Sequence, residues 1–298
     1  MLEYDHIHFD LETYVDNCSR NFKRVYERLD KYLENPTEES IHDMRTSLRR
    51  LEATYQSNPK PLRRKKKVKS FAETGKKLFR INSKIRDADI IIEKLSKDGN
   101  IPEQDLEYFE NPLMKEREQQ LEEARTIALN LKNIVVPNIY NHNKKFSKRS
   151  RNRISKLIME LKTSIDANLP VVLDDDSKIV ELHGIRKDAK KLRYLFELVL
   201  DREDEKDEKG IEKYNSSSGF KILSHLEKIQ KILGDIHDYD VAIDYLNQHP
   251  SSGSSIPKAL ANIKRMRKTK YKEFMEYIKP AGMVGVLQSS HIVSNNNS

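Results

Sequence analysis

The sequence predicts an all-α fold. Apolar residues recur every three or four positions through most of the chain, and the alternation of a β-strand is nearly absent. Charged residues make up 34% of the 298 residues and hydrophobic residues only 37%. This balance is typical of slender helical bundles, in which each helix buries one stripe of side chains and leaves the rest in water. Glycine (9) and proline (10) are few, so we expect long helices joined by few turns.

Four helices are expected in the first half of the chain. Asn35 and Pro36 end the first of them, and Thr37 before two glutamates is typical of a capped start of the second. The run 60–69 holds seven Lys or Arg, and we expect a solvated loop that could add to a polyanion-binding track. Pro137 ends the fourth helix. The expected helices cover residues 11–34, 37–55, 71–95 and 103–133.

The same pattern restarts after this break. Segment 168–177 is expected to be a linker, in which aspartates and Ser177 cap the next helix. The polar segment 201–219 is expected to be a loop, and the Ser/Asn-rich tail 280–298 to be disordered. The expected helices cover residues 145–168, 178–200, 220–247 and 257–279.

Two pairs of motifs indicate an internal duplication. "IHDMRTSLRRL" (41–51) and "LHGIRKDAKKL" (182–192) share His, Arg and Leu at the same spacing. "KIRDADIIIEKL" (84–95) and "DIHDYDVAIDYL" (235–246) share Asp-x-Asp. The repeat unit is as long as the offset between residues 41–51 and 182–192. A unit of this length predicts two copies of a four-helix bundle related by pseudo-symmetry, and not a solenoid, whose period is far shorter. The expected copies are residues 11–135 and 145–279.

Each motif helix has an apolar face and a narrow cationic face. At about 100° per residue, one histidine and two basic residues of each motif share a stripe opposite the apolar residues. The next helix of each half places basic residues at i, i+3 and i+7. The stripes are His42, Arg45 and Arg49, then Lys77, Arg80 and Lys84, then His183, Arg186 and Lys190, and finally Lys228 and Lys231 with Asp235.

These stripes favour an anion-binding site. Like charges three or four residues apart cost about 0.2–0.5 kcal/mol per pair, and acidic partners are nearly missing from the stripes. The net charge of +8 also favours an acidic partner. A solvated face with intrahelical ion pairs explains one such stripe, but it is a weaker explanation for four.

The pairs His42-Asp43 and His237-Asp238 raise the alternative of a metal-dependent hydrolase. The repeat places them at non-equivalent positions, and Gly184 replaces Asp43 in the second motif. No further ligands at suitable spacing complete a metal site. Glycine-rich phosphate loops, GxSxG and Cys–His nucleophile pairs are absent. We therefore expect no enzyme activity, no metal and no cofactor, with a phosphohydrolase or polyphosphatase as the alternative.

Four aspartates recur in the second motif pair: Asp87, Asp89, Asp238 and Asp240. We expect them to pair with the basic groups of the site and hold those groups in position.

Cys18 is the only cysteine, which is compatible with a reducing cytoplasm. The chain has no run of about 18 apolar residues and no apolar segment of a signal peptide at its start, so no membrane partner is expected.

The four motifs resemble the signatures of the CHAD family, the conserved-histidine α-helical domain. The resemblance spans about residues 11–279, and it implies a pseudo-symmetric pair of four-helix bundles around a central basic channel. It further implies a module that binds inorganic polyphosphate. The location that we expect is cytoplasmic, with association with polyphosphate granules as an open option. The triphosphate-tunnel domain that often accompanies the family is absent from this sequence. Nucleic-acid binding is a further alternative, although aromatic residues are few (7%) and show no base-stacking pattern.

The resemblance also implies which residues bind polyphosphate. Lysines at 190 and 191, where the signature favours arginine, predict a less specific grip by the second half, because lysine lacks a bidentate fork. Asp235 opposite Lys84 is a further departure. The implied residues are His42, Arg45, Arg49, Arg50, Lys77, Arg80 and Lys84, and His183, Arg186, Lys190, Lys191, Arg193, Lys228 and Lys231.

Overall fold

The computed structural model describes residues 9–138, 140, 143–200, 218–249 and 255–278. Every regular element within these ranges is a helix, which confirms the predicted all-α class. The predicted loop 201–219 lies mostly, and the predicted tail 280–298 entirely, outside the described residues. The helices are α1 (Leu11–Glu34), α2 (Glu38–Ser57), α3 (Lys60–Arg63), α4 (Lys66–Lys97), α5 (Glu103–Lys132), α6 (Lys144–Asp174), α7 (Ile179–Val199), α8 (Ser218–Gln248) and α9 (Ser255–Ile278).

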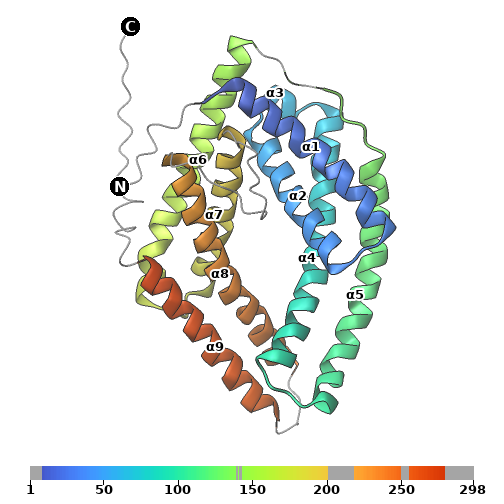
Figure 1. Cartoon of the computed structure of the whole chain (residues 1–298), viewed down its shortest axis with the longest axis vertical. Helices are drawn as coiled ribbons and strands as arrows, with labels where there is room; N and C mark the ends of the chain where they lie inside the picture. The colour runs from blue at the N-terminus through green and yellow to red at the C-terminus, as the bar shows by residue number, and fades with distance from the viewer. Residues whose placement is uncertain (1–8, 139, 141–142, 201–217, 250–254, 279–298) are drawn as a thin grey trace, which may run out of the picture.

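The helices form two groups that lie on either side of a central gap (Figure 1). α1, α2, α4 and α5 pack on one side, and α6, α7, α8 and α9 on the other. The groups meet where α2 and α1 contact α7 and where α4 contacts α8. Among the described residues, no helix combines the length and apolarity needed to cross a membrane. That the two groups are pseudo-symmetric copies stays a prediction.

The predicted loop at 60–69 is wrong, because this run contains α3 and the start of α4. Leu62 is 8% exposed and Val68 is fully buried. Burying two apolar side chains six residues apart anchors the run in helical turns, while its cations stay in water. Charge alone therefore gave a misleading signal for the backbone here.

The predicted linker at 168–177 is also mostly wrong, because α6 continues into it as far as Asp174. Pro170 lies inside the helix, and Val172 in the same turn is fully buried. Tertiary packing thus outweighs the helix-breaking cost of proline. Ser177 does not cap α7: the residue before that helix makes no side-chain cap, and the Ser177 backbone N–H donates to Asp175 Oδ1 at 2.8 Å.

The apolar faces of the two motif helices lie in the main core, as predicted. Met44 is fully buried on α2, and Leu192 is fully buried on α7. Gly75 on α4 allows close approach to α2, since a Cβ there would lie 3.2 Å from side-chain atoms of Leu48 and Leu51. A second apolar cluster, with Leu95 and Ile263 at its centre, joins the far ends of α4, α5, α8 and α9. The two groups are therefore fastened at both ends, and the gap lies between.

A buried carboxylate links the two groups near the α2–α7 contact. Glu197 on α7 is 7% exposed. Its Oε2 accepts a hydrogen bond from Arg50 Nε on α2 at 2.8 Å, and its Oε1 lies 3.3 Å from Arg193 Nε. Both guanidiniums also lie over the ring of Tyr194, at 5.8 and 5.0 Å. Glu197 thus pairs with two cations at the junction, and Arg193 pairs in addition with Glu227 of α8 at 3.1 Å.

Glu197→Gln is expected to destabilise the fold by about 3 kcal/mol, because it removes the buried carboxylate that pairs with both guanidiniums, although Arg193 keeps its ion pair with Glu227 at 3.1 Å. Glu123→Gln, which changes an exposed acid on α5, should shift the free energy of unfolding by less than about 0.5 kcal/mol. Urea denaturation of both variants measures the difference. Equal stability of the two would contradict a structural role for Glu197.

Candidate anion-binding site

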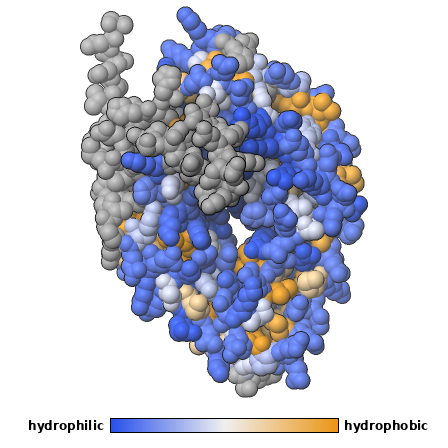
Figure 2. Space-filling view, viewed as in Figure 1, coloured by the Kyte–Doolittle hydropathy of each residue, from blue (hydrophilic) through white to orange (hydrophobic). Residues whose placement is uncertain are grey.

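A cavity of about 590 Å³ lies between the two groups of helices, with walls from α2, α4, α6, α7 and α8. Figure 2 shows hydrophilic side chains over most of one face of the molecule and around a hollow near its middle. The charged and polar residues that line the cavity are Arg45, Arg49, Glu52, Gln56, Ser83, Asp87, Glu160, Arg186, Lys187, Lys190, Lys191 and His237.

The cationic side of the cavity consists of the two predicted motif helices. Arg45 and Arg49 stand four residues apart on α2, and Arg186 and Lys190 stand four apart on α7, so each pair shares one helix face. Lys191, also predicted, lines the same cavity. Residues 141 positions apart in the sequence therefore meet at one site.

Contacts with α4 hold the two α2 arginines at the cavity wall. Arg45 Nη1 donates to the backbone oxygen of Asn82 at 2.8 Å. The guanidinium carbons of Arg45 and Arg49 lie 5.6 and 5.1 Å from the centre of the Phe79 ring. A cation over an aromatic face is favourable, and the ring fixes its position. Both guanidiniums are thus ordered without a carboxylate partner in these contacts.

Burial and mutual repulsion make this cationic cluster costly. Burial, and then the charge of Arg49, lower the pKa of Arg186 to about 10 and that of Lys190 to about 6. The pKa of Arg45 is lowered to about 10 by the same two causes. The Arg186 Nε is buried without a hydrogen-bond partner. A buried donor without a partner and crowded positive charges are features that a bound anion would relieve.

Two of the predicted aspartates face this cluster. Burial raises the pKa of Asp87 although Arg45 and Arg186 lower it, and burial likewise raises the pKa of Asp238 against the effect of Arg186. Asp87 lines the cavity directly. These carboxylates balance part of the positive charge from the α4 and α8 sides.

The other two predicted aspartates hold different arginines from those expected. Asp89 accepts from Arg117 Nε of α5 at 2.7 Å, and Asp240 forms an ion pair with Arg267 of α9. Asp89 and Asp240 are 151 positions apart, and the two arginines 150 apart. Both aspartates therefore tie the motif-bearing helix to the next helix of its own group.

The histidines are arranged differently from the prediction. His42 is exposed on α2 and does not line the cavity. His183 Nε2 lies 3.1 Å from Asp240 Oδ2 and 3.0 Å from His237 Nδ1. A hydrogen on His183 Nε2 satisfies both neighbours, so His237 accepts at Nδ1 and keeps its N–H at Nε2.

His237 is the functional candidate that the sequence did not assign to the anion site. It lines the cavity, and its pKa is lowered to about 2 by burial and then by the charge of Arg186. A neutral imidazole with a fixed N–H can donate one hydrogen bond to an anion. Lys187 is a second lining residue outside the predicted set. The alignment of His237 with the basic residue Arg86 was the available signal.

Several predicted residues lie outside the cavity. Arg50 and Arg193 pair with Glu197, and Lys228 Nζ lies 3.8 Å from Glu273 Oε1. The remaining residues of this kind are exposed on α4 and α8: Lys77, Arg80, Lys84 and Lys231. The stripes of the second helices thus do not line the same wall as those of the motif helices.

The described residues do not form the metal site that the hydrolase alternative requires. Within them, no three His, Cys, Asp or Glu side chains are grouped to hold a metal ion. Asp43 forms an ion pair with Arg28 at 2.6 Å. Cys18 is fully buried, and burial raises its pKa to about 12, so it carries little thiolate at neutral pH.

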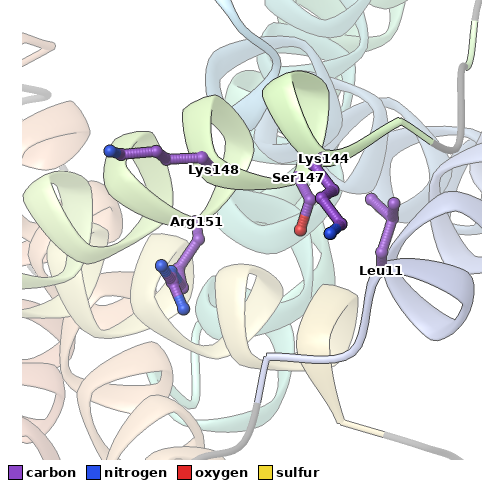
Figure 3. A pocket seen from close by; sticks show the side chains of 5 residues that line it. All are labelled: Leu11, Lys144, Ser147, Lys148 and Arg151. Carbon is purple, nitrogen blue, oxygen red and sulfur yellow. The ribbon is translucent and has the colours of Figure 1, made fainter.

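A smaller cavity of about 320 Å³ lies where α1 and α6 begin. Figure 3 shows Lys144, Ser147, Lys148 and Arg151 on successive turns of α6, with Leu11 of α1 beside them. The Lys148 side chain extends away from Leu11. This face of α6 is basic but open to water.

The fold and its interhelical cavity define an all-helical protein with a cationic internal site. A family model described as the CHAD domain matches residues 19–247, and the chain therefore belongs to the CHAD-domain family. A crystal structure of the CHAD domain from the plant Ricinus communis matches with a TM-score of 0.55 and 14% sequence identity. That match covers 94% of this chain and 92% of the other, and it shows a shared fold. No curated protein matches the chain.

Replacing Lys190 by Met should stabilise the protein at pH 7. The pKa of lysine in an unfolded chain is about 10.4, whereas that of folded Lys190 is about 6. Between these values the unfolded state binds the extra proton, so Lys190 makes the free energy of unfolding rise with pH. The contribution is at most about 1.4 kcal/mol per pH unit.

Urea denaturation at several pH values between 6.5 and 9 checks this expectation, with Lys187→Met as the matched control from an exposed position on the same helix. Lys190→Met should gain roughly 1 kcal/mol or more at pH 7 and lose the pH slope due to this residue. If both variants have equal stability and equal slopes, Lys190 is not held in a charge-repelling site.

Proposed function

We propose that this protein binds inorganic polyphosphate, without catalysis, and that the cavity is part of a basic channel for it. The observation that carries the proposal is the convergence of Arg45, Arg49, Arg186 and Lys190 from two helices on one cavity. Their burial and crowding are unfavourable until an anion is bound. Membership of the CHAD family supports the same conclusion.

The chemistry of the cavity suits a linear polyanion without bases. Guanidinium groups form charge-assisted hydrogen bonds with phosphate oxygens, and the neutral His237 adds one donor. The faces of Phe79 and Tyr194 lie against arginines, so they do not offer a free stacking surface for bases. Ile90, Leu157 and Leu161 form an apolar part of the lining, which lowers the local dielectric and strengthens each charge interaction. Polyphosphate therefore fits better than RNA.

Isothermal titration calorimetry with long-chain polyphosphate, single-stranded RNA and ATP, with and without Mg²⁺, tests the proposal. We expect polyphosphate to bind best and its affinity to fall with salt, with a slope of roughly −0.7 per neutralised phosphate. Equal competition by RNA would favour nucleic-acid binding. Metal-dependent phosphate release would favour a phosphohydrolase.

Arg49→Gln and Arg186→Gln should each weaken polyphosphate binding by roughly 10-fold or more, the value of one charge-assisted hydrogen bond of about 1.5–3 kcal/mol. Thermal unfolding should show that both variants remain folded, because each removes repulsion. Lys77→Gln is the matched control, since it removes an exposed cation of α4 outside the cavity. The proposed site is wrong if the control loses as much affinity as the cavity variants.

Polyphosphate affinity should fall as pH rises above about 6, because the bound anion raises the pKa of Lys190 from its value of about 6 in the free protein. Binding then takes up a proton, and affinity falls by at most about tenfold per pH unit. Lys190→Arg, which stays charged, should remove most of this dependence. Calorimetry in two buffers of different ionisation enthalpy counts the protons, and a count of zero at pH 7 would contradict Lys190 as their acceptor.

A further inference from the structure

Two strongly basic runs lie outside the cavity, and the fold brings them together. The run 60–69 contains seven Lys or Arg and the run 144–153 contains six, and neither contains an acidic residue. The first covers α3 and the start of α4, and the second covers the start of α6. The cavity uses none of these cations.

A hydrogen bond joins the second run to the edge of the cavity. Arg153 Nε of α6 donates to the backbone oxygen of Gln56 at 3.1 Å, and Gln56 is one of the residues that line the cavity. Leu157, one turn further along α6, lines the cavity as well. The basic start of α6 thus begins where the cavity lining ends.

The first run meets the same point from α3. Arg153 and Arg63 donate to backbone oxygens of the same segment, those of Gln56 and Asn58. Burial has the larger effect in lowering the pKa of Arg153, and the charge of Arg63 lowers it further. Arg63 itself donates from Nε to the backbone oxygen of Asn58 at 3.1 Å, two residues beyond Gln56. Cations from both runs therefore converge beside one end of the cavity.

Only one face of α6 takes part in this convergence. Lys145, Arg149 and Arg153 follow one another at i, i+4 and i+8, which places them along one face. Lys144, Lys148 and Arg151, which line the smaller cavity with Leu11, lie on a different face of α6 (Figure 3). Lys145 and Arg149 are exposed, as is Lys60 of α3, three residues before Arg63.

We propose that these two runs form a second, outer binding surface that continues from the cavity, so that a long polyphosphate chain leaves the cavity past Gln56 and is held along α3 and the Lys145–Arg149–Arg153 face of α6. The inference rests on the proposed function, because it extends the same polyanion beyond the internal site. Polyphosphate repeats its charge at regular intervals, and rows of cations without acids between them match that repeat. The outer surface makes affinity depend on chain length, whereas the cavity alone does not.

The test compares two triple variants of the full chain with tripolyphosphate and with long-chain polyphosphate. The track variant is Lys60→Gln, Lys145→Gln and Arg149→Gln, and the matched control is Lys144→Gln, Lys148→Gln and Arg151→Gln. Both remove three exposed positive charges. The control leaves the Lys145–Arg149–Arg153 face of α6 unchanged. Circular dichroism and thermal unfolding verify that each is folded.

We expect the track variant to bind long-chain polyphosphate at least tenfold more weakly than the control, with a shallower salt slope. Its affinity for tripolyphosphate should stay within twofold of wild type. An equal loss in both triple variants overturns the outer surface, since it would show a response to net charge alone. A larger loss for single-stranded RNA than for polyphosphate in the track variant also overturns it, in favour of a nucleic-acid surface.

Arg186→Gln separates this inference from the proposed function. It should weaken binding of both tripolyphosphate and long chains, because both occupy the cavity. If Arg186→Gln binds both as wild type does, the proposed function of the cavity fails, while the comparison of the two triple variants still decides whether the outer surface exists.

Discussion

The meeting of cations from α2 and α7 is the constraint on which the rest of the structure depends. Each helix buries an apolar face in the main core, so its neighbouring face has a fixed direction toward the other group of helices. On α2 that face carries Arg45 and Arg49, and on α7 it carries Arg186 and Lys190. Core packing therefore forces like charges together. Such crowded cationic side chains become tolerable if a nearby acid neutralises them, if one of them loses its proton, or if an anion binds between them.

The same two helices hold their basic residues in two different surroundings. At the junction, Glu197 pairs with Arg50 and Arg193, and Arg193 pairs in addition with Glu227. Two turns earlier on α7, Arg186 keeps a buried Nε without a partner and faces the cavity instead. The difference lies in the acids nearby: Glu197 pairs with Arg193 within α7 and with Arg50 across the α2–α7 contact, and Glu227 of α8 also pairs with Arg193. What a cation does here depends on its surroundings and not on its place in the motif.

This dependence explains how far the sequence could predict the fold and the site. Helical periodicity identified the long helices and the faces that are buried, because it depends on local spacing. It also identified Arg45, Arg49, Arg186 and Lys190, since they share faces with their motif histidines. It could not show that Arg50 would meet Glu197, 147 residues away, or that His237 would reach the cavity. The packing of whole helices decides which helix faces meet across the molecule, and local sequence spacing does not predict this packing.

The free protein lessens the cost of its own site by regulating charge. With a pKa of about 6, Lys190 is mostly neutral at pH 7. One of the four crowded basic side chains therefore carries no charge while the cavity holds no anion. His237, also neutral, adds a donor without adding to the repulsion. The apolar part of the lining makes uncompensated charge more expensive, and by the same low dielectric it makes each contact with an anion stronger. On the proposed function, such a site is tolerable when empty, and it would gain its full charge when polyphosphate compensates it.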